Sequence, residues 1–256
     1  MQTVYNLYPS IGIVGGLADL RNRTIISQIA ESDIQFGQAV VSGTIAGKVL
    51  PAGIASTEFF GVALYDATKE AGFTFGVGST GSLHRTGSMV PTIRQGAVYV
   101  TTNRTVAYGS AAYVDVSNLT STLRPLFTDL AEATTITFVG DFVASNTIDL
   151  NINGVAIVQV TFATNTNSTL QAVATSISNR LVAAGITAEV VVDTAARTIR
   201  IATVSDITVA SIVVALGAGT PTTGAATTVA NLATGGIFET ASTGAGTIAK
   251  LVINKP

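Results

Sequence analysis

The chain has 256 residues, enough for one large domain or two modest ones, and only 11% of them are charged while 47% are hydrophobic. Ordinary soluble domains carry about 25% charged residues, so this polar but nearly uncharged surface favours self-association and assembly with other proteins. A net charge of −2, with 13 scattered Lys and Arg, argues against a nucleic-acid partner, and the absence of Cys excludes disulfides, thiolate metal sites and Cys nucleophiles.

The first twenty residues predict an extended arm. Residues 1–20 have no sustained period of 2 or 3.6 and contain Pro9 and several glycines. They lack a basic start followed by an apolar run, so we expect no signal peptide. Nowhere does the chain approach the ~18 consecutive apolar residues of a membrane span. We therefore expect a soluble protein with no membrane partner.

Short β-prone runs follow the arm, separated by Gly, Pro and Asn. They cover residues 24–29, 34–41, 59–65, 90–93 and 97–102. Many short strands at this spacing are typical of an antiparallel barrel or sandwich. The sequence therefore predicts a mainly β protein with a β-barrel or β-sandwich base.

An Asn-Gly pair lies between two further strand-like runs, residues 147–152 and 155–162, and predicts a hairpin. The register depends on the loop length. A two-residue loop would place Ile148 opposite Gln159, whereas a three-residue loop would place it opposite Val158. We prefer the three-residue loop because it pairs apolar side chains.

The clearest helix of the chain follows this hairpin. Ser168 and Gln171 form a capping-box pattern at its start, and Gly185 marks its end. The residues expected on its apolar face are Leu170, Val173, Ile177 and Leu181. A second hairpin is predicted from residues 186–192 and 198–203, which completes a small α+β unit of ββαββ order.

The last part of the chain returns to β character. Residues 206–216 predict one strand, and residues 217–236, rich in Gly, Ala and Thr, predict a loop or linker. Residues 237–254 resume the β pattern, with a final strand at residues 251–253.

No group of residues predicts catalysis. His84, the one His, lies in a Gly- and Ser-rich segment, where we expect an exposed loop residue; a triad with Ser82 and Asp66 lacks the nucleophile elbow. Residues 76–81 match G-x-G-x-x-G, but Pro91 helps to break the helix that a dinucleotide needs behind the glycines. Carboxylates are sparse and form no Ca²⁺ loop. We predict no catalytic residues, no cofactor and no metal site, and hence no enzyme.

Short segments at both ends of the chain carry a family pattern. They are residues 8–20 (Y-P-S-I-G-I-V-G-G-L-A-D-L), 36–41 (F-G-Q-A-V-V), 59–63 (F-F-G-V-A), 94–100 (R-Q-G-A-V-Y-V), 236–242 (G-I-F-E-T-A-S) and 249–253 (A-K-L-V-I). In their order they resemble the cement (decoration) proteins of tailed bacteriophages, with Val62 where the family has Ile. This chain departs from shorter family members by carrying a long segment between the two halves.

The resemblance and the change in composition together predict three parts. They are the N-terminal arm (residues 1–20), a β-rich, capsid-docking base domain (residues 21–133 plus 234–256) and an inserted α+β domain (residues 134–233).

The resemblance also implies a function. It implies a virion protein that docks on the outer surface of the capsid, typically as a homotrimer, and ties neighbouring major capsid subunits together. Its partners would be the major capsid protein and itself. The arm residues hypothesised to contact the capsid are Tyr5, Tyr8, Ile11, Ile13 and Leu17. Deleting residues 1–20 is expected to leave a folded protein that no longer decorates capsids.

An alternative from another class stays open. The chain would then be a phage tail or fibre protein that binds a host-surface glycan through the inserted domain.

Overall fold

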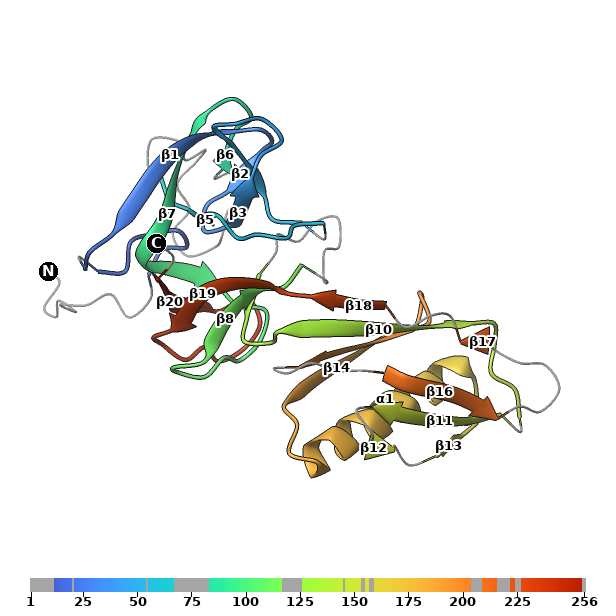
Figure 1. Ribbon diagram of the computed structural model, residues 1–256. Helices are drawn as coiled ribbons and strands as arrows, with labels where there is room; N and C mark the ends of the chain where they lie inside the picture. The colour runs from blue at the N-terminus through green and yellow to red at the C-terminus, as the bar shows by residue number, and fades with distance from the viewer. Residues whose placement is uncertain are drawn as a thin grey trace, which may run out of the picture. The chain divides into compact units, whose positions relative to one another are not determined.

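The computed structural model describes residues 12–19, 21–53, 55–66, 83–116, 126–144, 146–152, 155–156, 159–203, 209–215, 222–223 and 227–254. The chain divides into two compact units. Unit 1 comprises Met1–Asp129 and Leu232–Pro256, and unit 2 comprises Leu130–Asn231. The predicted mainly β fold is confirmed, because strands make up almost all of the regular structure and the one helix among the described residues belongs to unit 2 (Figure 1).

Five strands of unit 1 close into a barrel. In barrel order they are β1 (Thr24–Ala30), β4 (Lys48–Pro51), β3 (Ala39–Ser42), β5 (Gly61–Ala63) and β7 (Met89–Thr101). The ring is complete because β1 pairs with β4 on one side and with β7 on the other. Two short strands, β2 (Ile34–Gln35) and β6 (Leu83–His84), pair separately. The buried residues of the barrel cluster are Ala30, Ile34, Val40, Val49, Ala63 and Val90.

Strand β7 belongs both to the barrel and to the part of the same nine-stranded sheet that continues beyond it. Its first part pairs with β1 as far as Gln95, and residues 95–101 pair with β20 (Ile248–Asn254). The sequence predicted two strands here, interrupted at Gly96. They form one strand because both ladders hold the backbone around Gly96, which lies opposite Ile253.

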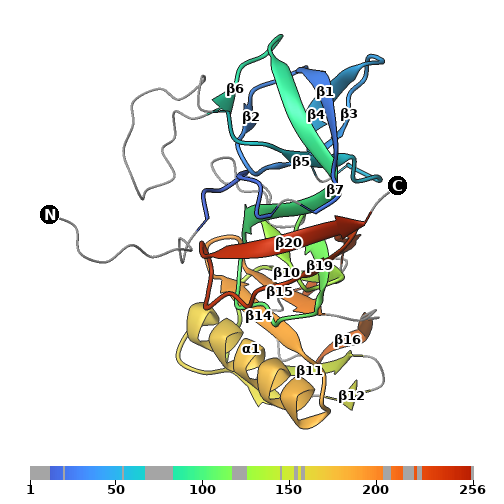
Figure 2. The ribbon, with the colours of Figure 1, turned by 90° about the vertical axis from the view of Figure 1, so that its left-hand side faces the viewer.

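The sheet continues beyond β20 with three more strands. Its further strands are β19 (Leu232–Phe238), β8 (Ala111–Val114) and β9 (Phe127–Thr128). Figure 2 shows β20 between β7 and β19. The C-terminal hairpin therefore completes a sheet that the N-terminal half begins. This confirms a base built from two sequence-distant segments.

Unit 2 contains two sheets and helix α1 (Thr166–Ala183). The strands of the first sheet are β14 (Ala188–Asp193), β15 (Thr198–Thr203), β10 (Glu132–Val139), β17 (Thr222–Thr223) and β18 (Thr227–Ala230). Those of the second are β12 (Val155–Ala156), β13 (Val160–Thr161), β11 (Thr147–Ile152) and β16 (Val209–Ala215). The four predicted apolar helix residues are all buried in the core of this unit, as the 3.6-residue period requires.

The helix begins earlier than predicted. Its N-cap is Asn165, whose side-chain oxygen accepts a hydrogen bond from the Ser168 N–H at 2.9 Å. The capping role predicted for Ser168 is therefore wrong, because Asn165 has the extended backbone of an N-cap residue while Ser168 is already helical. At the other end, the Ile186 N–H bonds to the Leu181 carbonyl, and Gly185 has the left-handed conformation that stops a helix.

The preferred register of the first hairpin is also wrong. Ile152 pairs with Val155, so the loop has two residues, as the Asn-Gly pair favours. Further along, Ile148 pairs with Val160 rather than with Val158 or Gln159. The register thus shifts by one residue between β12 and β13. Because of this shift Ile148 lies opposite the apolar Val160 and not opposite the polar Gln159.

Besides the short strands β4, β6, β8 and β9, two longer stretches contain strands that the sequence did not predict. Residues 217–236 include β17, β18 and the start of β19, so they are not one continuous loop. Strand β10 was missed at residues 132–139, where it pairs with β15 on one side and with β17 and β18 on the other. Thr-rich runs supply β-branched side chains to both stretches, and this signal was outweighed by the neighbouring Gly and Ala.

Candidate functional site

Residues 12–19, which we term the arm root, lie along β7 and form an isolated antiparallel bridge with it, in which Leu17 is opposite Val98. The Gly15 N–H donates to the Tyr99 carbonyl at 2.8 Å, and the Tyr99 N–H donates to the Gly16 carbonyl at 3.0 Å. The Ala18 N–H donates to the Ala97 carbonyl at 3.0 Å. β7 is therefore paired on both sides over this stretch, with β20 on one and the arm root on the other.

The arm root fits closely because of a contact between two glycines. Gly15 is buried, and its carbonyl accepts a hydrogen bond from the Tyr65 N–H at 2.9 Å. A Cβ at Gly15 would lie 2.7 Å from the Gly37 nitrogen, and a Cβ at Gly37 would overlap the Val14 side chain. Both glycines also have positive φ, so no other residue fits without strain.

The arm root is therefore part of the folded base. Deleting residues 1–20 would remove the hydrogen-bond partners of β7 and Tyr65, so we now expect that truncation to destabilise unit 1. A truncation confined to residues 1–11 leaves these bonds in place.

The hypothesised capsid-contact residues fall into two groups. Ile13 and Leu17 belong to the arm root, with exposed fractions of 58% and 39%. Leu17 lies opposite the buried Val98 of β7. Tyr5, Tyr8 and Ile11 lie outside the described residues.

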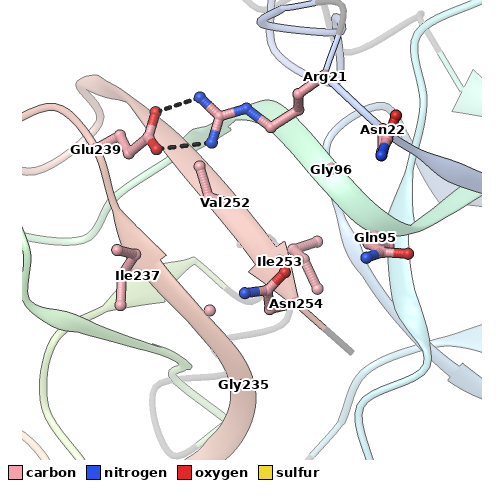
Figure 3. A pocket seen from close by; sticks show the side chains of 11 residues that line it. Arg21, Asn22, Gln95, Gly96, Gly235, Ile237, Glu239, Val252, Ile253 and Asn254 are labelled. Atoms are coloured by element: carbon pink, nitrogen blue, oxygen red, sulfur yellow. Dashed lines mark hydrogen bonds and ion pairs between the residues drawn. The ribbon is translucent and has the colours of Figure 1, made fainter. Parts of the chain in front are cut away.

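A network of four charged side chains fastens the end of the arm root to the C-terminal hairpin. The Arg21 guanidinium donates to both carboxylate oxygens of Glu239, at 2.7 and 2.8 Å (Figure 3), and its Nε donates to Asp19 at 2.7 Å. The Lys250 ammonium lies 2.8 Å from Asp19 and 2.9 Å from Glu239. Each cation thus contacts both carboxylates. No spacing pattern in the sequence predicts this network, because its members come from opposite ends of the chain.

The network shifts the pKa values of its members toward the charged forms. Partial burial acts to raise the pKa of Asp19, but hydrogen bonds from Arg21 and Lys250 outweigh it and lower this pKa from 3.8 to about 2. Hydrogen bonds from Arg21 and Lys250 lower the pKa of Glu239. Burial acts to lower the pKa of Lys250, and hydrogen bonds to Asp19 and Glu239 raise it overall.

A surface pocket of about 480 Å³ lies beside this network. It spans β7, β19, β20 and the segment that follows the arm root (Figure 3). The lining residues are Arg21, Asn22, Gln95, Gly96, Gly235, Gly236, Ile237, Glu239, Val252, Ile253 and Asn254. Amides, glycines and aliphatic side chains dominate the lining, and it contains no residue type suited to nucleophilic or acid–base chemistry other than the ion-paired Glu239.

His84 does not lie on the surface. Its side chain is fully buried, its Nε2 lies 2.9 Å from the Leu64 carbonyl oxygen, and its ring meets that of Phe36 edge-on. The predicted exposed loop position is therefore wrong. His84 belongs to strand β6, where it lies opposite the buried Ile34. Ser82 and residues 76–81 lie outside the described residues.

In the part of the chain that the structure describes, no three His, Asp or Glu side chains are grouped so that they could hold a metal ion. No helix within that same part is long and apolar enough to cross a membrane.

Comparison with known proteins gives the family. No curated protein matches the chain. Residues 1–161 match the family model of phage cement proteins, described as structural cement protein (E217 gp24/Pam3 gp6). The match includes unit 1 up to Asp129 and the first strands of unit 2, and it ends before α1 and the C-terminal hairpin. Because it covers well over half of the 256 residues, this chain belongs to the family of phage structural cement proteins.

Proposed function

We propose that this protein binds the outer surface of a phage head as a homotrimer and stabilises the contacts between major capsid subunits. Family membership supports a structural, capsid-stabilising role. The observation that carries the more specific proposal is the pairing of the arm root with β7 and its ionic attachment to the C-terminal hairpin. Residues 1–11 are thereby tethered to a firmly held point of the base.

The chemistry of the arm suits docking onto a protein surface. Tyr5 and Tyr8 offer large, amphipathic side chains of the kind enriched at binding hot spots. Ile13 and Leu17 add exposed apolar area where the arm joins the base. Each contact is weak alone, but three arms in a trimer would act together through multivalency.

The test uses capsids assembled without this protein. Purified full-length protein and a truncation lacking residues 2–11 are each titrated onto the capsids, and bound copies are counted by mass and by cryo-electron microscopy. We expect the full-length protein to occupy sites on the outer surface as trimers. The truncation should remain folded and lose most of its binding. Undiminished binding by the truncation would refute the role of the arm, and absence of the full-length protein from the outer surface would refute the proposed function.

A further inference from the structure

The pocket beside the charge network lies on the outward face of the C-terminal hairpin. Along β19, buried residues alternate with the exposed Ala233, Gly235 and Ile237. Gly235 and Ile237 line the pocket together with the exposed Asn254 of β20. Its volume of about 480 Å³ falls within the ~300–1,000 Å³ range of ligand pockets.

The charged side chains that line this pocket neutralise each other. Arg21 and Glu239 are the charged lining residues, and they form a bidentate ion pair with distances of 2.7 and 2.8 Å. Asp19 and Lys250, which do not line the pocket, form further ion pairs with Arg21 and Glu239. A charged ligand in the pocket would have to break this pairing or remain without a counter-ion, and both are unfavourable. The pocket therefore selects an uncharged occupant.

The remaining walls match the chemistry of a polypeptide backbone. Gly235 has no atom within 4 Å of the place where a Cβ would stand, so another chain can approach the backbone of β19 there. The pairing of β19 with β8 has a bulge between Ala233 and Gly236. Thr234 holds its conformation, because its hydroxyl donates to the Ala112 carbonyl and accepts a hydrogen bond from the Gly236 N–H. Asn22, Gln95 and Asn254 each carry an amide, which offers the donor and the acceptor that a peptide group needs.

Ile237 gives the pocket an apolar contact, with an exposed fraction of 45%. It lies opposite Val252, which also lines the pocket. A segment with a small apolar side chain would cover this pair, while its backbone faces the amides. The pocket is also continuous with the arm, because Arg21 and Asn22 come directly after residues 1–20 in the chain. A protein that holds the arm would therefore meet the pocket as well.

We propose that this pocket binds an uncharged, extended segment of the major capsid protein, as a second docking point next to the arm. This inference rests on the proposed capsid-binding function. It names a second contact with the capsid, made by the C-terminal hairpin, and states which kind of segment binds there. This hairpin lies outside the region matched by the family model.

The test places a positive charge in the pocket. Ile237→Lys is compared with Ile45→Lys, whose side chain is similarly exposed, at 53%, in the β3–β4 turn of the barrel. Both full-length variants are titrated onto the same capsids. We expect Ile237→Lys to weaken binding by about tenfold or more, equivalent to ~1.4 kcal/mol, and Ile45→Lys to bind within about twofold of the unaltered protein.

A photo-crosslinking side chain at position 237 gives a second readout that does not depend on loss of binding. On capsids it should crosslink to the major capsid protein, and the same group at position 45 should not. Equal binding of Ile237→Lys and the unaltered protein would overturn the inference, as would crosslinks from position 237 to another copy of this chain. If the unaltered protein does not bind capsids at all, the proposed function itself fails.

Discussion

Arg21 and Glu239 lie 218 positions apart in the sequence, yet their side chains meet in a two-pronged ion pair at 2.7 and 2.8 Å. The pair joins the segment after the arm root to strand β19's C-terminal end, beside Lys250 of β20. It therefore links the two segments of chain that build unit 1. Its strength and its response to pH and salt can be measured in the isolated protein.

The first prediction concerns the stability that this ion pair contributes. Glu239→Gln removes the charge that Arg21 and Lys250 share and should lower the free energy of unfolding by about 1 kcal/mol, the upper range for partly exposed pairs. Urea unfolding at neutral pH measures it. The matched control is Arg85→Ala, because the Arg85–Asp33 pair is far more exposed, and there we expect a change of less than ~0.5 kcal/mol. The difference between the variants should shrink at high salt; a salt-independent difference would rule out an ionic origin.

The second prediction concerns acid. The folded-state pKa of Asp19 is lowered from 3.8 to about 2, so its contribution to stability is fully present above pH 3.8 and is lost as the pH falls toward 2. Glu239 is shifted in the same direction. The free energy of unfolding of the unaltered protein, minus that of Asp19→Asn, should be constant from neutral pH to about pH 4 and then fall. A difference that already declines above pH 5 would contradict a lowered pKa.

The third prediction tests how closely the arm root packs against the rest of unit 1. Gly15 and Gly47 have nearly equal positive φ angles, 80° and 83°, but only Gly15 has neighbouring backbone atoms where a Cβ would stand. Gly47→Ala should therefore cost only the left-handed strain of roughly 1 kcal/mol. Gly15→Ala adds a steric clash and should cost about 2–4 kcal/mol. Urea unfolding compares the two, and hydrogen exchange at the Tyr99 amide reports whether the arm root has moved away from β7. Equal costs would mean that the arm root is not closely packed.

The fourth prediction tests the start of helix α1. Asn165→Ala removes the side-chain oxygen that accepts the Ser168 N–H and should lower stability by about 1 kcal/mol. Ser168→Ala leaves that bond intact, since only the backbone of Ser168 takes part, and should change stability by less than ~0.5 kcal/mol. A larger effect from Ser168→Ala would restore the capping role predicted from sequence.

These contrasts show how far sequence reasoning reaches in this fold. The buried face of α1, including Leu170 and Ile177, follows from a local 3.6-residue period. Ser168 was predicted as the N-cap in place of Asn165 because both side chains can cap a helix. Only the backbone conformation distinguishes the two residues. The burial of His84 depends on Phe36 and Leu64, which are distant in sequence, so no local pattern could predict it.

The candidate site was predictable only in part, for a related reason. The capsid contact of Ile13 and Leu17 stays a prediction from the resemblance. The Gly-rich sequence around them has no period, and its conformation is set by hydrogen bonds to Tyr99 and Tyr65. The charge network and the pocket require Arg21 to meet Glu239 across most of the chain. Side chains brought together only by the assembled sheet leave no spacing signal in the sequence.

The position of β7 in both the barrel and the β7–β20 ladder has a consequence for cooperativity. A strand that carries both ladders cannot separate from one without straining its pairing with the other. We therefore expect the slowest-exchanging amides of the barrel and of the β7–β20 ladder to exchange through the same opening event. Unit 1 would then unfold as a single foldon, with no partly opened form in which the barrel persists after the C-terminal hairpin has detached.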